Sequence, residues 1–275
     1  MGSWTSKAEI DRTKVHDKNM KIVIIRLDYA GVTDLLDLIK SFDQTIKSFK
    51  QREEVYNNQL NLNIREEDIQ TISKTLSIPV NIIRKEKIYR YSNAEFGECQ
   101  TTLDISQYFL CMTIISKNNY DGLTVYSQVF QQTAELFKTQ IKFFNPKRLG
   151  LRKTRVENFN TIDEIQSTFE PNLFCFNHFN DIPDKEYHSK IYKDVFRNNQ
   201  LSIFANINRS ILPVKKDDQD KLQTQLDIDT YYDTQHYKTI FQKFSFAQLL
   251  ENANQYEFEI YKSCLTLEHL NKISD

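Results

Sequence analysis

Five cationic side chains fall within the nine residues 147–155 of this sequence. A proline precedes them and apolar residues separate them, which predicts a strand over 148–156. Side chains on a strand alternate between its two faces. One face would then carry Arg148 and Arg152, and the other Lys153 and Arg155. Because a sheet buried on one side cannot cover both sets, we expect some of these cations to reach solvent or a partner.

A second basic stretch interleaves cations with tyrosines. Cations that neutralise phosphates, beside rings that stack on bases, are typical of nucleic-acid-binding surfaces. The candidate binding patch therefore consists of Arg148, Arg152, Lys153, Arg155, Arg84, Lys87, Arg90, Tyr89 and Tyr91. The alternative is that these cations pair with carboxylates on neighbouring strands, and a formal net charge of -1 for the whole chain favours that alternative.

Two aspartates two positions apart, Asp227 and Asp229, would lie on one face of another strand. With Asp28 as a third ligand they could hold a divalent metal ion. Carboxylates that alternate with aliphatic residues are equally typical of a solvated strand face. The chain has only five glycines and shows no Walker loop, no glycine-rich dinucleotide turn, no GxSxG and no HExxH. We therefore predict no cofactor.

The composition narrows the class of protein. With 275 residues, 40% of them hydrophobic, the chain can bury a large core. Thirty-six basic and thirty-seven acidic residues create no global field that would recruit nucleic acid or an acidic membrane. The longest apolar run, 108–115, is less than half of a membrane span, so we expect no membrane partner. Four isolated cysteines predict reduced thiols and a cytoplasmic protein.

The elements that must position these residues follow from periodicity. The clearest helix carries an apolar stripe at steps of three and four: Tyr126, Phe130, Ala134, Phe137, Ile141 and Phe144. Strands are expected at 21–29, in a sheet covered on both faces, at 60–64, several between 80 and 116, and at 195–212 and 223–232. Helices are expected at 33–54, 68–76, 161–170 and 246–270. A long loop over 171–192 and a polar hairpin over 213–220 complete the chain.

This order predicts an α+β fold with antiparallel β-sheets backed by long helices. We expect residues 1–18 to be disordered or tag-like and 19–275 to form a single domain. The alternation of strands and helices also allows two similar packed halves, 19–120 and 121–275.

With that order established, the chain resembles a sporadically distributed, largely uncharacterised family of bacterial proteins. Its members carry a strand of the form Arg-x-Gly-Leu-Arg-Tyr-x-Asn after a long central helix. Here Arg148-Leu-Gly-Leu-Arg152 matches, whereas Lys153 replaces the tyrosine and Arg155 stands in the place of the asparagine. The resemblance implies a bacterial protein carried with mobile elements or phage-defence loci, and it implies no established activity.

Two functional hypotheses follow. The first is a non-enzymatic recognition protein of a bacterial accessory system, such as phage defence, a toxin–antitoxin module or a mobile element. It would bind a protein partner, and the aromatic segment with Phe174, Phe176 and Phe179 offers an apolar contact. The second is a metal-dependent enzyme directed at nucleic acid, of the nuclease or phosphotransfer class. Convergence of the two arginines and two aspartates on one cleft would favour the second. The sequence does not fix the oligomeric state.

Overall fold

A computed structural model describes residues 7, 10–12, 15, 17–32, 35–57, 86–117, 120, 122–174, 190–216 and 218–274. The expected elements at 60–64 and 68–76 and most of the loop at 171–192 lie outside these residues, as do Arg84, Cys175, Phe176 and Phe179. The three described cysteines, Cys99, Cys111 and Cys264, form no disulfide.

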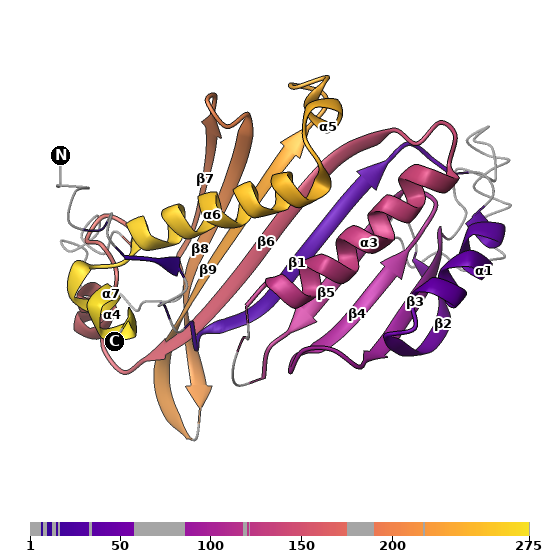
Figure 1. Ribbon diagram of the computed structural model, residues 1–275. Helices are drawn as coiled ribbons and strands as arrows, with labels where there is room; N and C mark the ends of the chain where they lie inside the picture. Colours follow the sequence, from indigo (N-terminus) through magenta and orange to yellow (C-terminus); the bar gives the residue numbers. More distant parts are fainter. Residues whose placement is uncertain are drawn as a thin grey trace, which may run out of the picture.

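The described strands form one antiparallel sheet in the order β2-β3-β4-β5-β1-β6-β9-β8-β7 (Figure 1). Their bounds are β1 Met20–Tyr29, β2 Phe49–Asn57, β3 Glu86–Ala94, β4 Gln100–Ile105, β5 Phe109–Ile115, β6 Pro146–Phe159, β7 Lys190–Asn198, β8 Ile203–Lys216 and β9 Gln219–Asp233. The mixed α+β class is confirmed. The first strand and the basic strand are neighbours at the middle of the sheet, so the basic strand is a central element and not an edge.

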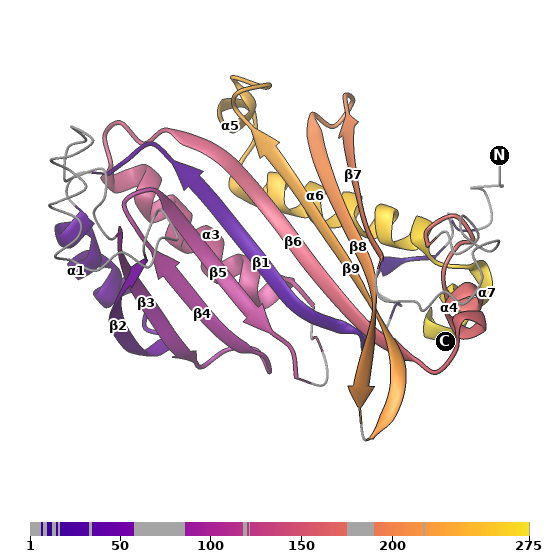
Figure 2. The same ribbon diagram turned by 180° about the vertical axis from the view of Figure 1, so that it is seen from behind.

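The described helices are α1 Leu35–Thr45, α3 Thr124–Gln140, α4 Ile162–Thr168, α5 Ile240–Lys243, α6 Phe246–Cys264 and α7 Leu267–Ser274. Figure 1 shows α3 and α6 lying across the same face of the sheet. Seen from behind, in Figure 2, no described helix crosses β1, β6, β9 or β8. None of the described helices combines the length and the apolar character that crossing a bilayer requires.

The expectation that β1 is covered on both faces is therefore wrong for the described part of the chain. Val23, Ile25 and Leu27 are buried, whereas Ile24 and Arg26 between them are only partly covered. Alternating burial of this kind is what one-sided cover by helices produces. The run of aliphatic residues concealed this alternation, because Ile24 is apolar although it lies on the helix-free face.

The aromatic stripe of α3 forms the centre of the larger core. Tyr126, Phe130 and Phe137 are fully buried. The ring of Phe137 lies 4.9 Å from that of Phe42 on α1 and 5.1 Å from that of Tyr29 on β1. One helix face thus joins α1 to the sheet, as the spacing of the stripe predicted.

Three expected boundaries are wrong. The helix expected to run to residue 54 ends at Thr45, and β2 begins at Phe49 because residues 49–57 pair with β3. The expected strand 195–212 is divided between β7 and β8 by a turn in which Ser202 has a φ of 55°. The C-terminal helix ends at Cys264, because Leu265 leaves the helix to bridge Phe169. In the first and third cases a partner distant in the sequence overrides local periodicity, whereas β7 and β8 pair with each other across their own turn.

Three smaller features bear on earlier expectations. Phe174 is buried against Phe169, at 5.1 Å between ring centroids, so it is not an exposed apolar contact. Two described residues before β1 form ion pairs with the rest of the protein: Lys7 pairs with Glu170, and Asp17 pairs with Arg155. The polar hairpin expected at 213–220 is present, with Asp218 in its turn at a φ of 59°.

The start of α6 offers a direct test of this local structure. Ser245 accepts a hydrogen bond from the backbone N–H of Gln248, and the Gln248 side chain accepts one from the backbone N–H of Ser245, which is a complete capping box. Ser245→Ala should lower the free energy of unfolding by about 1 kcal/mol. Urea denaturation measures the loss. Ser127→Ala inside α3 is the control, and an equal loss there would contradict the capping role.

Candidate functional site

The helix-free face of the sheet carries four arginine–aspartate pairs, which together we call the arginine face. Its members are Arg26 with Asp28, Arg90 with Asp104, Arg148 with Asp229, and Arg152 with Asp227. They come from β1, β3, β4, β6 and β9. Strand register brings them together: Arg26 lies opposite Gly150, and Arg152 lies opposite Asp229. Residues directly opposite each other on neighbouring strands share a face, so this surface follows from the pairing.

The pair of Arg152 and Asp227 contains the most buried of the four carboxylates. The guanidinium donates from both Nε and Nη2 to the two carboxylate oxygens, each at 2.7 Å. Thr154 and Asn208 donate to the same carboxylate at 3.2 and 3.3 Å. These donors satisfy the carboxylate oxygens of Asp227, whose side chain is only 2% exposed. A bidentate pair of this kind also fixes the orientation of the arginine.

Arg148 is held between a carboxylate and a ring. Its Nη2 donates to Asp229 at 2.7 Å, and its guanidinium lies 4.5 Å from the ring centroid of Tyr231. Asp28 is a more distant counter-charge at 3.8 Å. Gly150 makes room for this arrangement, since a Cβ at that position would lie only 3.0 Å from Nη1 of Arg148. Because Gly150 has no side chain, the guanidinium of Arg148 can lie close over the backbone of the strand.

Arg26 repeats this arrangement on β1. Its Nε donates to Asp28 at 2.7 Å, and its guanidinium lies 4.3 Å from the ring centroid of Phe109. On β3, Arg90 donates twice to Asp104 at 2.8 Å. The hydrogen bond to Asp104 raises the pKa of Arg90, although burial acts against it. Each of these cations is therefore a fixed charge.

In all four pairs the side chain of the arginine is more exposed than that of its aspartate. The side chain of Arg152 is 47% exposed above Asp227 at 2%, and that of Arg90 is 35% exposed above Asp104 at 14%. The other two pairs follow the same order. The acidic groups thus form a lower layer and the arginines an upper one. An arginine has five N–H donors and no acceptor, so the surface presents hydrogen-bond donors to solvent although its charges balance.

Asp229 lies in an environment that favours its uncharged form. Burial raises the pKa of Asp229, against the effect of Arg148 and Arg152. Protonation would remove the ion pair with Arg148 and leave its guanidinium to other acceptors.

The nine residues of the predicted basic patch do not form one surface. Lys153 and Arg155 lie on the opposite face of β6, buried beneath α6, where both pair with Glu257 at 2.7 and 2.6 Å. Tyr89 and Tyr91 are buried as well and offer no stacking surface. Lys87 pairs with Glu54 at 2.8 Å. Arg148, Arg152 and Arg90 remain on the helix-free face. Strand alternation places the described members of the patch on two faces, and each described cation among them forms an ion pair with a carboxylate.

The three aspartates suggested as metal ligands do share the helix-free face, but arginines contact each of them. Among the described residues no group of three or more His, Cys, Asp or Glu side chains is placed to hold a metal ion. A metal at Asp227 would have to displace a bidentate guanidinium from an almost fully buried carboxylate. The arrangement is suited to holding arginines and not to coordinating a cation.

Sequence reasoning missed several residues of both faces. Arg26 and Asp104 belong to the arginine face through register alone, and no local signal shows that they oppose the basic strand. Glu257, within the helix expected at 246–270, was not singled out by the sequence, although it is fully buried. Its spacing of four from Ala253 and three from Asn254 placed it near the apolar side of the helix, which could have raised the question of a buried partner. Comparisons with protein-family models, with curated proteins and with solved structures gave no significant match.

Proposed function

We propose that this protein is a non-enzymatic recognition protein that binds an acidic segment of a partner protein on its arginine face. The observation that carries the proposal is the layering of the four ion pairs, in which every arginine lies above its aspartate. Partner carboxylates approaching this face meet donors first. Guanidinium groups suit such a contact because their planar geometry binds carboxylates in a bidentate manner.

The arginines are oriented before any partner arrives. Arg148 and Arg26 each rest on an aromatic ring and each donate to a carboxylate. Two contacts per side chain restrict its rotamers, so little conformational entropy remains to be lost on binding. Arg152 is fixed by two hydrogen bonds to one carboxylate, which leaves its Nη1 to donate outward.

An acidic protein segment fits this face better than nucleic acid does. Nucleic acid binds largely through release of its condensed counterions, which requires cations in excess of nearby carboxylates, and here each arginine has a carboxylate partner. A short acidic segment can instead bind through hydrogen bonds from the guanidinium groups without a net positive charge. The rings of Tyr231 and Phe109 lie under guanidinium groups, so they are not open to stacked bases. The alternative, a metal-dependent enzyme directed at nucleic acid, is favoured by the gathering of Arg148, Arg152, Asp227 and Asp229 on one face, but the pairing of these residues with one another weakens it.

We further propose that this recognition serves a bacterial accessory system in the cytoplasm, such as phage defence or a mobile element. The resemblance of the strand Arg148-Leu-Gly-Leu-Arg152 and the absence of disulfides among the described cysteines support that part. We also propose that the chain consists of two similar halves joined at β1 and β6. Outward from β1 lie β5, β4 and β3, and outward from β6 lie β9, β8 and β7. The arginine face would then span the seam between the halves, 19–120 and 121–275.

Arg26→Gln provides the test with the least effect on folding, because Arg26 is 43% exposed and Asp28 keeps Arg148 as a more distant counter-charge. The probe is a fluorescent glutamate-rich peptide, followed by anisotropy. Loss of a charge-assisted hydrogen bond worth about 1.5 kcal/mol should weaken peptide binding roughly 10-fold. Arg152→Lys, which keeps the charge but not the bidentate geometry, should weaken it as well.

The control is Lys50→Gln on β2, which removes one exposed cation away from the arginine face. It should bind the peptide like the wild type. Single-stranded and duplex DNA are titrated in parallel at two salt concentrations. Absence of peptide binding by the wild type at about 50 mM salt would refute the proposal. Tighter binding of DNA, with a steep salt dependence that Arg26→Gln reduces, would support the nucleic-acid alternative instead.

A further inference from the structure

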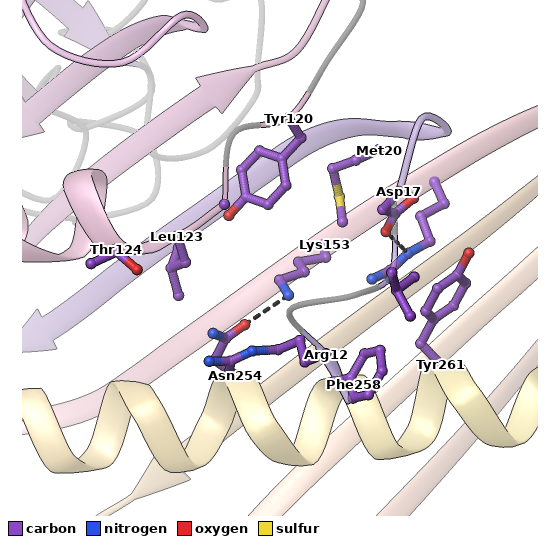
Figure 3. A pocket seen from close by; sticks show the side chains of 13 residues that line it. Arg12, Asp17, Met20, Tyr120, Leu123, Thr124, Lys153, Asn254, Phe258 and Tyr261 are labelled. Atoms are coloured by element: carbon purple, nitrogen blue, oxygen red, sulfur yellow. Dashed lines mark hydrogen bonds and ion pairs between the residues drawn. The ribbon is translucent and has the colours of Figure 1, made fainter. Parts of the chain in front are cut away.

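A cavity of about 420 Å³ lies on the other side of β6 from the arginine face (Figure 3). It is bounded by β6, by α6, by the start of α3 and by described residues that precede β1. Its volume falls in the range of small-molecule sites in proteins. The site is separate from the proposed protein contact, since β6 sends alternate side chains to the two faces.

A buried cation lies on the floor of this cavity. Lys153 is 5% exposed, and its ammonium group donates to Oδ1 of Asn254 at 2.8 Å and pairs with Glu257 at 2.7 Å. An ammonium group has three N–H donors, and these two partners engage two of them. Figure 3 shows the side chains of Lys153 and Asn254 meeting between the strand and the helix. The third donor remains for a group inside the cavity.

Two further donors without partners border the same space. Nη1 of Arg12 is buried and has no hydrogen-bond partner among the described residues, while Nη2 pairs with Glu251 on the surface. Asn254 is 4% exposed, and because its oxygen accepts from Lys153, its amide nitrogen is left to donate elsewhere. A buried donor without an acceptor costs about 1–3 kcal/mol. Donors from three side chains therefore border this space, to which Asp17 also presents one acceptor, Oδ1, that has no hydrogen-bond partner among the described residues.

The charges around the cavity balance, because Arg12, Lys153 and Arg155 are opposed by Glu251, Glu257 and Asp17. An anion is favoured by the unengaged N–H donors and not by net charge. The lining residues include three cations, Arg12, Lys153 and Arg155, and one carboxylate, Asp17. Asp17 is already paired with Arg155 at 2.6 Å, and Glu257 lies beneath as the second buried carboxylate. Part of the wall is apolar, with Met20, Leu123 and Phe258 buried around it. Helix α3 begins beside the cavity without a side-chain cap, which adds the positive end of its dipole.

We infer that this cavity binds a small organic anion, whose carboxylate or phosphate head is held by Lys153, Asn254 and Arg12. The apolar body of the ligand would pack against Met20 and Phe258. The head supplies the acceptors that the buried donors lack, and the body replaces water on the apolar wall. This binding does not depend on the acidic partner of the arginine face.

Three probes that share a phenyl ring test the inference by isothermal titration calorimetry: benzoate, phenyl phosphate and benzamide. Benzoate and phenyl phosphate share the anionic head, and the tighter of the two identifies it as carboxylate or phosphate. Benzamide has the same ring and no charge. We expect at least one anion to bind with a dissociation constant at or below about 1 mM, and benzamide to bind at least about 10-fold more weakly. Failure of both anions to bind at about 10 mM, or equal binding of benzamide, would overturn the inference.

Two substitutions locate the site. Asn254→Asp places a negative charge against the ligand head, and Arg12→Gln removes the buried donor while losing only an exposed ion pair. Each should weaken binding of the anion by about 10-fold or more. The control is Gln248→Glu, which adds the same charge near the start of α6 and keeps its capping box. Thermal melts accompany all variants. If Asn254→Asp fails to fold, Arg12→Gln decides, and unchanged binding by a folded Arg12→Gln variant would refute the site.

Discussion

Replacing Glu257 with glutamine is expected to lower the free energy of unfolding by about 3–5 kcal/mol, which would be one of the largest effects of any single substitution in this chain. Glu257 is fully buried and is the shared counter-charge of Lys153 and Arg155, at 2.7 and 2.6 Å. Both cations are almost completely buried too. Glutamine keeps the shape and removes the charge, so two almost fully buried cations would remain with only Asp17 opposite them.

Chemical denaturation at neutral pH measures this loss, and Glu259→Gln on the same helix is the control. Glu259 is 46% exposed and pairs with Lys262 on the surface, so its replacement should change stability by less than about 0.5 kcal/mol. Equal effects of the two substitutions would show that the buried cluster does not hold the fold together.

The pH dependence of the wild type and the variant provides a second check. Burial alone would raise the pKa of Glu257, but Arg155 and Lys153 bring it below its ordinary value. A carboxyl group with a depressed pKa stabilises the fold above its unfolded pKa, and that contribution is lost as pH falls through the folded pKa. The wild type should therefore lose this stability below about pH 4.5, and Glu257→Gln should not show that step.

The variant should behave differently at alkaline pH. Burial lowers the pKa of Lys153, and the charge of Glu257 opposes that effect. Without Glu257, the neutral form of Lys153 is favoured further in the folded state. A base with a depressed folded pKa binds fewer protons folded than unfolded, so stability rises with pH between the two pKa values. We expect the deficit of Glu257→Gln to shrink as the pH is raised. A deficit that stays constant would contradict the assignment of the cost to a buried ammonium.

The second large effect is expected for Phe137→Ala, at about 3–5 kcal/mol. Phe137 is fully buried, and its ring meets those of Tyr29, Phe42 and Phe144. These rings belong to β1, to α1 and to the segment after α3, so the cavity left by alanine would open where three parts of the fold join. The surrounding elements are anchored elsewhere and can collapse into it only partly.

Phe143→Ala is the matched control, because Phe143 lies just beyond the end of α3 and is 82% exposed. The same atoms are deleted, yet the loss should stay within about 0.5 kcal/mol. Urea denaturation of both variants measures the loss of unfolding free energy at each position. An unchanged slope m shows that the comparison is between like transitions. A loss below about 1 kcal/mol for Phe137→Ala would mean that α3 is not the centre of the core.

The basic strand shows how much of the candidate site could be predicted from the sequence. Alternation alone assigned Arg148 and Arg152 to one face and Lys153 and Arg155 to the other, and the structure has this division. Which face is covered could not be read locally, because the answer depends on where α6 packs. The sequence suggested that carboxylates on neighbouring strands pair with the cations, but not which ones. Asp227 comes from β9, and Glu257 comes from a helix that lies over the strand.

Local pattern by itself determined the α+β class, the aromatic face of α3, the strand that follows it and the capped helix at Thr161, because each depends on neighbours within a few residues. Tertiary structure decided the rest. Residues 49–57 form a strand and not the end of a helix because β3 pairs with them. The arginine face exists because register aligns strands far apart in the chain, and the buried cavity exists because α6 and residues before β1 close over Lys153. Hydrogen bonds and ion pairs between distant segments outweigh local preference, and no single stretch of sequence encodes them.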